Sequence, residues 1–322
     1  MNKISIIIPC AILDINNKIE IDRFSRFQEQ LRNIASIPNK PDNIRWVFIE
    51  VYETKPLLRG TISKFVPNSI YFEHKKPVEQ KFNQVKLWYD YIDRANSDEW
   101  EDDFIVFTHS DILFSKNLYK VLNSRVIDKS KNYYAFRYDT MKRDNEITNN
   151  EVGVRELPCS DYGFDYILEH YGFSPTSTIL SAYYINTDTI VNIQPKQIPE
   201  SFMCISLDNF KGFDREKLTV GTYHNDVVIR DLSVVYGINH EWLSDELILL
   251  HMRGLDDMNK TAESDYNTTE EIIKNIPELQ HFGMFRFHPR FLPYMKTIDK
   301  RYIYEKYIKN KVPQQYSPEG FI

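Results

Sequence analysis

Glycine is scarce in this sequence, and large side chains are plentiful. The 322 residues include only 10 glycines, alongside 21 tyrosines, 20 phenylalanines and 4 tryptophans. This composition leaves few positions for flexible linkers and excludes a disordered or low-complexity protein. A chain of this length and composition is expected to form one large domain or two smaller ones.

Cysteine and long apolar runs are also in short supply, and acidic residues outnumber basic ones. Cys10, Cys159 and Cys204 are far apart, odd in number and without metal-finger spacing, so we expect reduced thiols in a cytoplasmic protein. The net charge of −6 argues against a nucleic-acid-binding protein, which normally presents a basic surface. No apolar run is long enough to cross a bilayer, and the run Ile4–Pro9 is too short for a signal peptide.

Short apolar segments alternate with segments of helical periodicity along the first third of the chain. The expected strands are Ile4–Ile8, Arg45–Tyr52, Ile70–Phe72 and Phe104–Thr108, and the expected helices are Ile21–Ile37, Lys81–Arg94 and Ser115–Asn123. Pro9 is expected to end the first strand, because proline cannot continue a central ladder. A late strand is expected at Leu247–His251. The alternation predicts an α/β fold, with helices on both faces of a mostly parallel sheet.

The segment Phe104–Ile112 is the most informative part of the sequence. Its apolar run indicates a strand buried on both faces, and it breaks at His109-Ser110-Asp111. Ligands bind outside the carboxyl ends of such strands, so Asp111 is placed to hold a divalent cation. The alternative is an ordinary aspartate that caps the next helix. The preceding acidic run, Asp98–Asp103, is expected to be a solvent-exposed face.

Four motifs follow one another in a recognisable order. Ile4–Pro9 is an opening strand, and Phe82-Asn83-Gln84-Val85-Lys86-Leu87 looks like the Phe-Asn-Arg-Ala-Lys-Leu element of the galactosyltransferases. His109-Ser110-Asp111 takes the place of a DXD metal motif. Gly212-Phe213-Asp214 followed by Asn225-Asp226 is similar to a "Gly-Gly-Phe … Glu-Asp" pattern. Over roughly residues 3–255, this order resembles the nucleotide-sugar glycosyltransferases of the GT-A fold, particularly family 2 and the β-1,4-galactosyltransferases.

The resemblance implies a Rossmann-like GT-A domain over residues 1–255. Residues 1–115 would form its nucleotide-binding half and residues 116–255 its acceptor half. Residues 256–322, where the composition changes, would be a mostly helical C-terminal extension.

The resemblance also implies a metal site that holds Mn²⁺ or Mg²⁺ against a diphosphate. Asp111 is its principal ligand, and His109 and His251 are further candidates. Because His109 replaces the first aspartate of the motif, only Asp111 matches the family pattern. Imidazole favours Mn²⁺ over Mg²⁺. For His251, the alternative is a histidine that merely packs at a strand end.

The remaining site residues come from the same resemblance. The UDP-sugar would be bound by Pro9, Glu50, Glu53, Phe82, Asn83, Lys86, His109, Ser110 and Arg253. Glu50 and Glu53 both qualify as the acid that contacts the base. Asp226 would be the general base that takes the proton from the acceptor hydroxyl, since an inverting transfer needs such a carboxylate. The alternative role for Asp226 is a helix N-cap.

Together these features predict an inverting, metal-dependent glycosyltransferase that moves a sugar from a UDP-sugar to a saccharide or lipid-linked saccharide. We expect it to act in bacterial surface polysaccharide synthesis: capsule, O-antigen or lipooligosaccharide. Two alternatives are a nucleotidyltransferase on a similar fold and a non-catalytic carbohydrate-binding protein on a degenerate GT-A fold. The basic, aromatic segment Tyr302–Lys311 either packs on the domain or lies on the inner face of the cytoplasmic membrane.

Overall fold

The computed structural model describes residues 1–13, 17–76, 84–95, 100–135, 137–140, 142–143, 190–191, 194–196, 202–218, 228–252 with gaps, and residue 274. The C-terminal extension expected over residues 256–322 lies outside this part of the chain, apart from residue 274.

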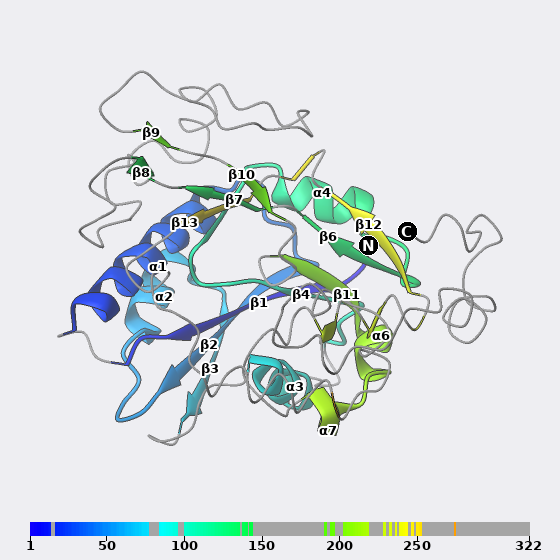
Figure 1. The fold of residues 1–322 in the computed structure, drawn as a ribbon, viewed down its shortest axis with the longest axis horizontal. Coiled ribbons are helices and arrows are strands. Elements are labelled where there is room, and N and C mark those ends of the chain that lie inside the picture. Colours follow the sequence, from blue (N-terminus) through cyan, green and yellow to red (C-terminus); the bar gives the residue numbers. More distant parts are fainter. Residues whose placement is uncertain are drawn as a thin grey trace.

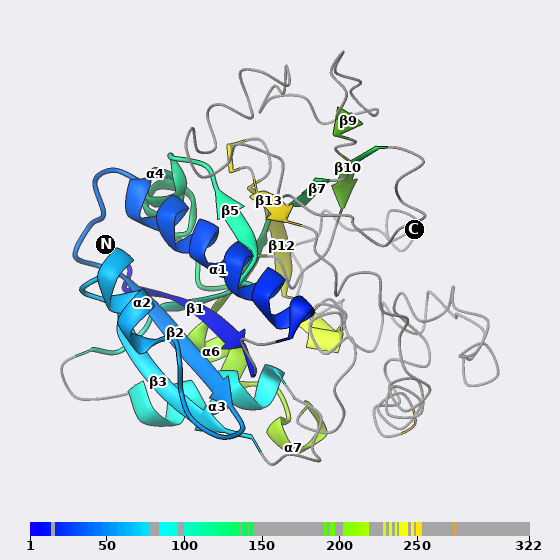
Figure 2. The same ribbon diagram turned by 90° about the vertical axis from the view of Figure 1, so that its left-hand side faces the viewer.

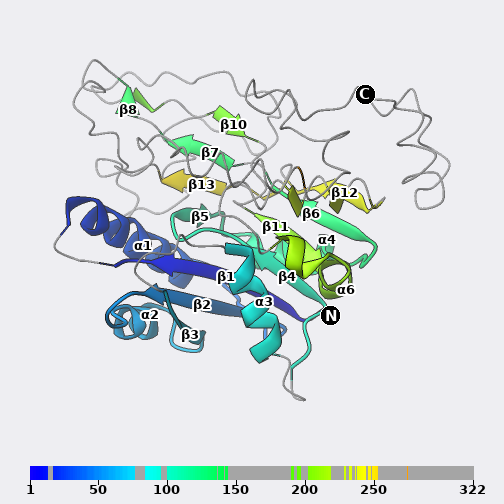
Figure 3. The same ribbon diagram turned by 60° about the horizontal axis from the view of Figure 1, so that its bottom comes forward.

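A seven-stranded sheet forms the centre of the molecule (Figure 3). In order across the sheet, its strands are β12 (Asn239–Trp242), β6 (Lys131–Tyr134), β11 (Met203–Ser206), β4 (Phe104–Phe107), β1 (Ile4–Ala11), β2 (Ile44–Tyr52) and β3 (Ile70–Lys75). Four neighbouring strands, β4, β1, β2 and β3, are parallel, and β11 runs antiparallel to both of its neighbours. The predicted α/β fold with a mostly parallel sheet is confirmed.

A smaller sheet begins where β4 ends. Its four strands, in order, are β10 (Gln194–Lys196), β7 (Arg137–Thr140), β13 (Leu249–Met252) and β5 (Ile112–Phe114). The short strands β8 (Lys142–Arg143) and β9 (Ile190–Val191) pair separately. After β4 the chain therefore leaves the large sheet and joins the small one within a few residues.

Helices cover both faces of the large sheet (Figure 1). One layer consists of α1 (Lys18–Ser36), α2 (Arg59–Phe65) and α4 (Leu118–Arg125), and the other of α3 (Gln84–Ala95), α6 (Leu207–Lys211) and α7 (Arg215–Leu218). In the described part of the chain, no helix has the combination of length and apolar character needed to span a membrane.

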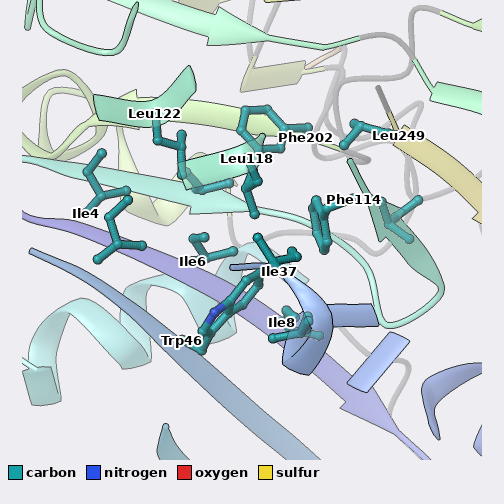
Figure 4. Packing of buried hydrophobic residues seen from close by; sticks show 14 of the residues in the cluster. Ile4, Ile6, Ile8, Ile37, Trp46, Phe114, Leu118, Leu122, Phe202 and Leu249 are labelled. Atoms are coloured by element: carbon teal, nitrogen blue, oxygen red, sulfur yellow. The ribbon is translucent and has the colours of Figure 1, made fainter. Parts of the chain in front are cut away.

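Alternation along β1 divides the core between these two layers. Ile4, Ile6 and Ile8 face the layer of α1 and α4, where they pack around Trp46 (Figure 4). Ile7 faces the α3 layer. All five side chains are fully buried, and each contributes about 2 kcal/mol of hydrophobic stabilisation. This packing holds β1, β2 and β4 rigidly between the two helix layers, and with them the loops at their carboxyl ends.

The first strand runs through Pro9 to Ala11 instead of ending at the proline, so that expectation is wrong. β4 pairs with β1 only as far as Ile7, and from there on β1 has a partner on the β2 side alone. A strand with one open side tolerates a proline, because the missing N–H breaks no ladder there. Pro9 thus marks the place where the sheet opens.

Candidate functional site

A pocket of about 390 Å³ lies where the parallel strands end. Pro9 and Ala11 of β1, Val51 of β2 and the turn His109–Asp111 after β4 line it. In open α/β sheets, ligands bind at this edge, outside the carboxyl ends of the strands. The fold therefore brings the turn identified in the sequence to the position where a ligand is expected.

The turn after β4 joins the large sheet to the small one, and this junction brings Asp111 next to His251. His251 is directly opposite Ile112 in the antiparallel pair of β13 and β5. The backbone N–H of Met252 donates to the carbonyl of Asp111 at 2.9 Å. The His251 Nε2 atom lies 3.4 Å from Asp111 Oδ2. Two of the three residues predicted as metal ligands are thus neighbours, although 140 positions separate them in the sequence.

The two carboxylate oxygens of Asp111 have different surroundings. Arg26 Nη1 donates to Oδ2 at 2.8 Å, whereas Oδ1 is buried and has no hydrogen-bond partner among the described residues. Burial raises the pKa of Asp111, but the positive charges of His251, Arg26 and His109 outweigh it and hold the pKa well below its usual range. The group is therefore a carboxylate with one oxygen open. A buried polar atom without a partner calls for an explanation, such as a bound ion.

Positively charged side chains line the same pocket and were missed by the sequence analysis. Arg23, Arg26 and Lys76 all contribute to its wall. Arg23 pairs with Glu20 at 2.6 Å, and Lys76 pairs with Glu53 at 3.1 Å. A pocket with three cations suits an anionic ligand such as a diphosphate.

Glu50 and Glu53, the two candidates for contacting a base, lie in very different environments. Glu50 is fully buried, and its carboxylate accepts hydrogen bonds from the backbone of Leu57 at 2.5 Å and Leu58 at 3.0 Å and from the Tyr71 hydroxyl. It holds the segment that starts α2. Glu53 is partly exposed and pairs with Lys76, which lines the pocket, although Glu53 itself does not. The Glu50 carboxylate is thus saturated by its own fold, whereas Glu53 has one partner, beside the pocket.

The other predicted site residues divide into two groups. Lys86 is exposed on α3 and does not line the pocket, although its neighbour Gln84 does. Phe82, Asn83, Asp226 and Arg253 lie outside the described residues.

The donors around Asp111 agree with a metal ion that is held jointly with a ligand. Within the described residues, no group of three or more His, Cys, Asp or Glu side chains is arranged to hold a metal by itself. The open Oδ1 of Asp111 is nevertheless a suitable ligand for a hard cation such as Mg²⁺ or Mn²⁺. Such ions commonly take one or two carboxylates from the protein and the rest of their ligands from phosphates and water. The residues fit a cation that arrives with a phosphate-containing ligand.

A second buried aspartate lies at the opposite end of β4. Asp102 is only 5% exposed, so the expectation that the acidic run Asp98–Asp103 is a solvent-exposed face is wrong for this residue. Asp102 Oδ1 accepts hydrogen bonds from Ser5 at 2.5 Å and from the Trp100 indole at 2.7 Å. Its Oδ2 accepts from the Tyr91 hydroxyl at 2.7 Å and pairs with Arg45 at 3.4 Å. Both oxygens are fully used.

Comparisons with known proteins find similarity in structure only. No family model and no curated protein matches the sequence. Among solved structures, GalNAc-T7 with UDP, GalNAc and Mn²⁺ is 10% identical with a TM-score of 0.48; the match covers 95% of this chain and 55% of that one. Staphylococcus aureus TarS 1–349 with UDP-GlcNAc is 12% identical over 91% of this chain and 73% of that one, with a TM-score of 0.47. The mannosyltransferase PcManGT from Pyrobaculum calidifontis, with GDP-Man and Mn²⁺, is 11% identical over 91% and 68%, with a TM-score of 0.40.

Proposed function

We propose that this protein is an inverting, metal-dependent glycosyltransferase that uses a UDP-sugar. The observation that carries the proposal is the open oxygen of Asp111, in a cation-lined pocket at the carboxyl ends of parallel strands. Nucleotide ligands bind at this edge of open α/β sheets, and an unpartnered buried carboxylate oxygen suits a divalent cation. The similar structures contain UDP, GalNAc and Mn²⁺ in GalNAc-T7, GDP-Man and Mn²⁺ in PcManGT, and UDP-GlcNAc in TarS, which agrees with this proposal.

The proposal assigns residues to the phosphates and to the base of the nucleoside diphosphate. Arg23 and Lys76 are placed for the phosphates, because both line the pocket. We assign the base contact to Glu53, because Glu50 already accepts three hydrogen bonds from its own fold. The sequence motif adds Phe82, Asn83 and Arg253 as further contacts with the donor.

A divalent ion in this site would be held by Asp111, with His251 or His109 as a second ligand and oxygens of the diphosphate completing its coordination. It would neutralise the charge that grows on the departing diphosphate. Before an ion binds, burial raises the pKa of Asp111, but His251, Arg26 and His109 outweigh it and hold the pKa below the usual range, so that the group is already a carboxylate.

The acceptor side follows from the sequence motif around Asp226, which we propose as the general base. It would take the proton of an acceptor hydroxyl while that oxygen attacks the anomeric carbon. The acceptor would be a saccharide or a lipid-linked saccharide of a bacterial surface polysaccharide. The basic, aromatic segment Tyr302–Lys311 would then bring the cytoplasmic enzyme to the inner face of the membrane.

Calorimetry with UDP, with and without Mn²⁺, tests the proposal together with two substitutions. Asp111→Ala is expected to abolish metal-dependent binding of UDP, because it removes the open oxygen. Asp226→Ala is expected to stop sugar transfer and to leave UDP binding intact. Asp128→Ala is a matched control, because this aspartate accepts from Ser130 on an exposed turn and does not line the pocket.

Two results would contradict the proposal. Normal turnover by Asp226→Ala would remove the assigned base. Absence of UDP binding at any Mn²⁺ concentration would favour the second candidate, a non-catalytic carbohydrate-binding protein. That candidate draws support from the lack of a three-ligand metal cluster among the residues described.

A further inference from the structure

Helix α1 carries a row of buried polar residues where an amphipathic helix would normally bury apolar ones. Asp22, Arg26, Gln30 and Asn33 follow one another at spacings of four, four and three residues, so they share one side of the helix. All four are buried. Side chains of this kind are rarely buried unless each one has a specific partner.

Two of these side chains bind the backbone of the segment that follows β4. Asn33 donates to the carbonyl of Phe114 at 3.1 Å and accepts from its N–H at 2.8 Å. Gln30 donates to the carbonyls of His109 at 2.5 Å and Ile112 at 2.9 Å. β5 is the edge strand of the small sheet, so one side of its backbone has no neighbouring strand. The amides of Gln30 and Asn33 make the hydrogen bonds to β5 that such a strand would make. Figure 2 shows α1 lying along β5.

Arg26 is the member of the row that reaches the carboxylate of Asp111. Its Nη1 donates both to Asp111 Oδ2 at 2.8 Å and to the carbonyl of Met252 at 3.1 Å. Its Nε donates to Asp22 Oδ2 at 3.2 Å, one turn earlier in the helix. The guanidinium thus joins the turn that carries Asp111 to the strand that carries His251.

We propose that Arg26 is a positioning residue for Asp111, which directs Oδ1 toward the divalent cation that accompanies the nucleotide diphosphate. The contact with Arg26 occupies Oδ2 and leaves Oδ1 as the oxygen without a partner. Asp22 accepts a hydrogen bond from Arg26 Nε and so fixes the guanidinium. The Asp111 carboxylate is therefore held by Arg26, which is itself held by Asp22 of the same helix. The inference rests on the proposed function and adds a residue that the motif does not contain.

Arg26 also lines the pocket, which gives it a competing role as a direct phosphate ligand. The two roles differ in their dependence on metal. A phosphate ligand contributes to UDP binding with or without a cation. A positioning residue affects mainly the affinity for the cation, and loss of a side chain that orients a metal ligand typically costs about 10- to 100-fold in metal affinity.

The test is a titration of Mn²⁺ in the presence of UDP, followed by electron paramagnetic resonance, together with a titration of UDP without metal. For Arg26→Met we expect Mn²⁺ affinity to fall by about 10- to 100-fold and metal-free UDP affinity to fall by a clearly smaller factor, because the pocket loses one of its three cations but no direct phosphate contact. Arg26→Lys keeps the charge but not the planar fork that serves three partners, so we expect an intermediate Mn²⁺ affinity. Arg32→Met is the control, because Arg32 lies on the same helix and pairs with Glu29.

Removal of Arg26 leaves Asp22 as a buried carboxylate without its cation, which can prevent folding. The double variant Asp22→Asn, Arg26→Met removes that leftover charge, and thermal unfolding shows whether it is folded. It is expected to repeat the loss of Mn²⁺ affinity.

Three results would overturn the inference. Wild-type Mn²⁺ affinity in both folded variants means that Arg26 does not orient Asp111. An equal loss of metal-free UDP binding means that Arg26 contacts the phosphates directly. If the wild-type protein itself shows no UDP-dependent binding of Mn²⁺, the proposed function fails and this inference fails with it.

Discussion

An aspartate lies near each end of β4: Asp102 is buried, Asp111 is half-buried with a buried Oδ1 atom, and the two carboxylates have different partners. Asp102, before the strand, receives hydrogen bonds on both oxygens from Ser5, Trp100, Tyr91 and Arg45. Asp111, after the strand, has one oxygen bound to Arg26 and the other without a partner among the described residues.

The difference separates a structural site from a candidate binding site more clearly than burial or charge does. Both groups are negative and mostly covered by protein. At Asp102 the fold provides every partner that the carboxylate needs, so nothing remains for a ligand. At Asp111 the fold provides enough positive charge to keep the group ionised but leaves one acceptor open beside a pocket. A buried polar atom without a partner calls for an explanation, and the pocket beside Asp111 provides one, namely a bound ion.

The comparison predicts the largest loss of stability for removal of Asp102, the carboxylate with partners on both oxygens. Asp102→Ala is expected to lower the free energy of unfolding by about 3–5 kcal/mol, because it leaves the Arg45 charge without its carboxylate and the Trp100 indole without its acceptor. Asp111→Ala is expected to cost less, about 1–2 kcal/mol, since Arg26 keeps its ion pair with Asp22 and its bond to the carbonyl of Met252. Urea denaturation of the two variants measures both values. An equal loss of stability in both would show that the two ends do not differ in this way.

The parts of the fold that depend on local sequence were predictable. The apolar runs of β1, β2 and β4 placed these strands to within a few residues, because buried parallel strands have an unmistakable composition. β11 was not predicted, since its four residues have no pattern of their own and their pairing partners lie about 70 and 100 positions away. β5 has only three residues and forms through its pairing with β13.

The candidate site was predictable only in part, for a related reason. Asp111 could be identified because it comes shortly after an apolar run that predicts a strand. Its place at the end of a strand is therefore readable from neighbouring residues. The inward orientation of Asp102 depends on Ser5, 97 positions away, so the acidic run around it gave no sign of burial. Arg26 could have been identified from the sequence. The spacing of Asp22, Arg26, Gln30 and Asn33 places them on one side of the predicted helix, and polar residues in a row there indicate specific partners.

The hydrogen bonds around Asp102 should also make the stability of the protein depend on alkaline pH, through Tyr91. Burial, and next the charge of Asp102, raise the pKa of the Tyr91 hydroxyl above its usual value of about 10. Above pH 10 the unfolded chain releases this proton and the folded chain keeps it, so this group's contribution to stability falls as the pH rises. The slope approaches about 1.4 kcal/mol per pH unit.

Tyr91→Phe isolates this contribution, because the other tyrosines are the same in both proteins. At pH 8 the variant is expected to be less stable than the wild type by about 1–2 kcal/mol, since the bond that the hydroxyl donates to Asp102 and the bond that it accepts from Arg45 are lost. The difference should shrink between pH 10 and 11. Unfolding free energies measured from pH 8 to 11 test this, and a constant difference would contradict the raised pKa.

The smallest effect is expected from Trp100→Phe, which makes the environment of Asp102 slightly more like that of Asp111. The variant loses the indole N–H that donates to Asp102 Oδ1, whereas Ser5 still donates to the same oxygen. The ring position against the Arg45 guanidinium, 4.5 Å from the Trp100 centroid, stays filled by an aromatic side chain. We expect a loss of about 1 kcal/mol in the free energy of unfolding and unchanged UDP binding. A larger loss would mean that Asp102 depends on each of its donors, whereas weaker UDP binding would mean that the two ends of β4 are coupled.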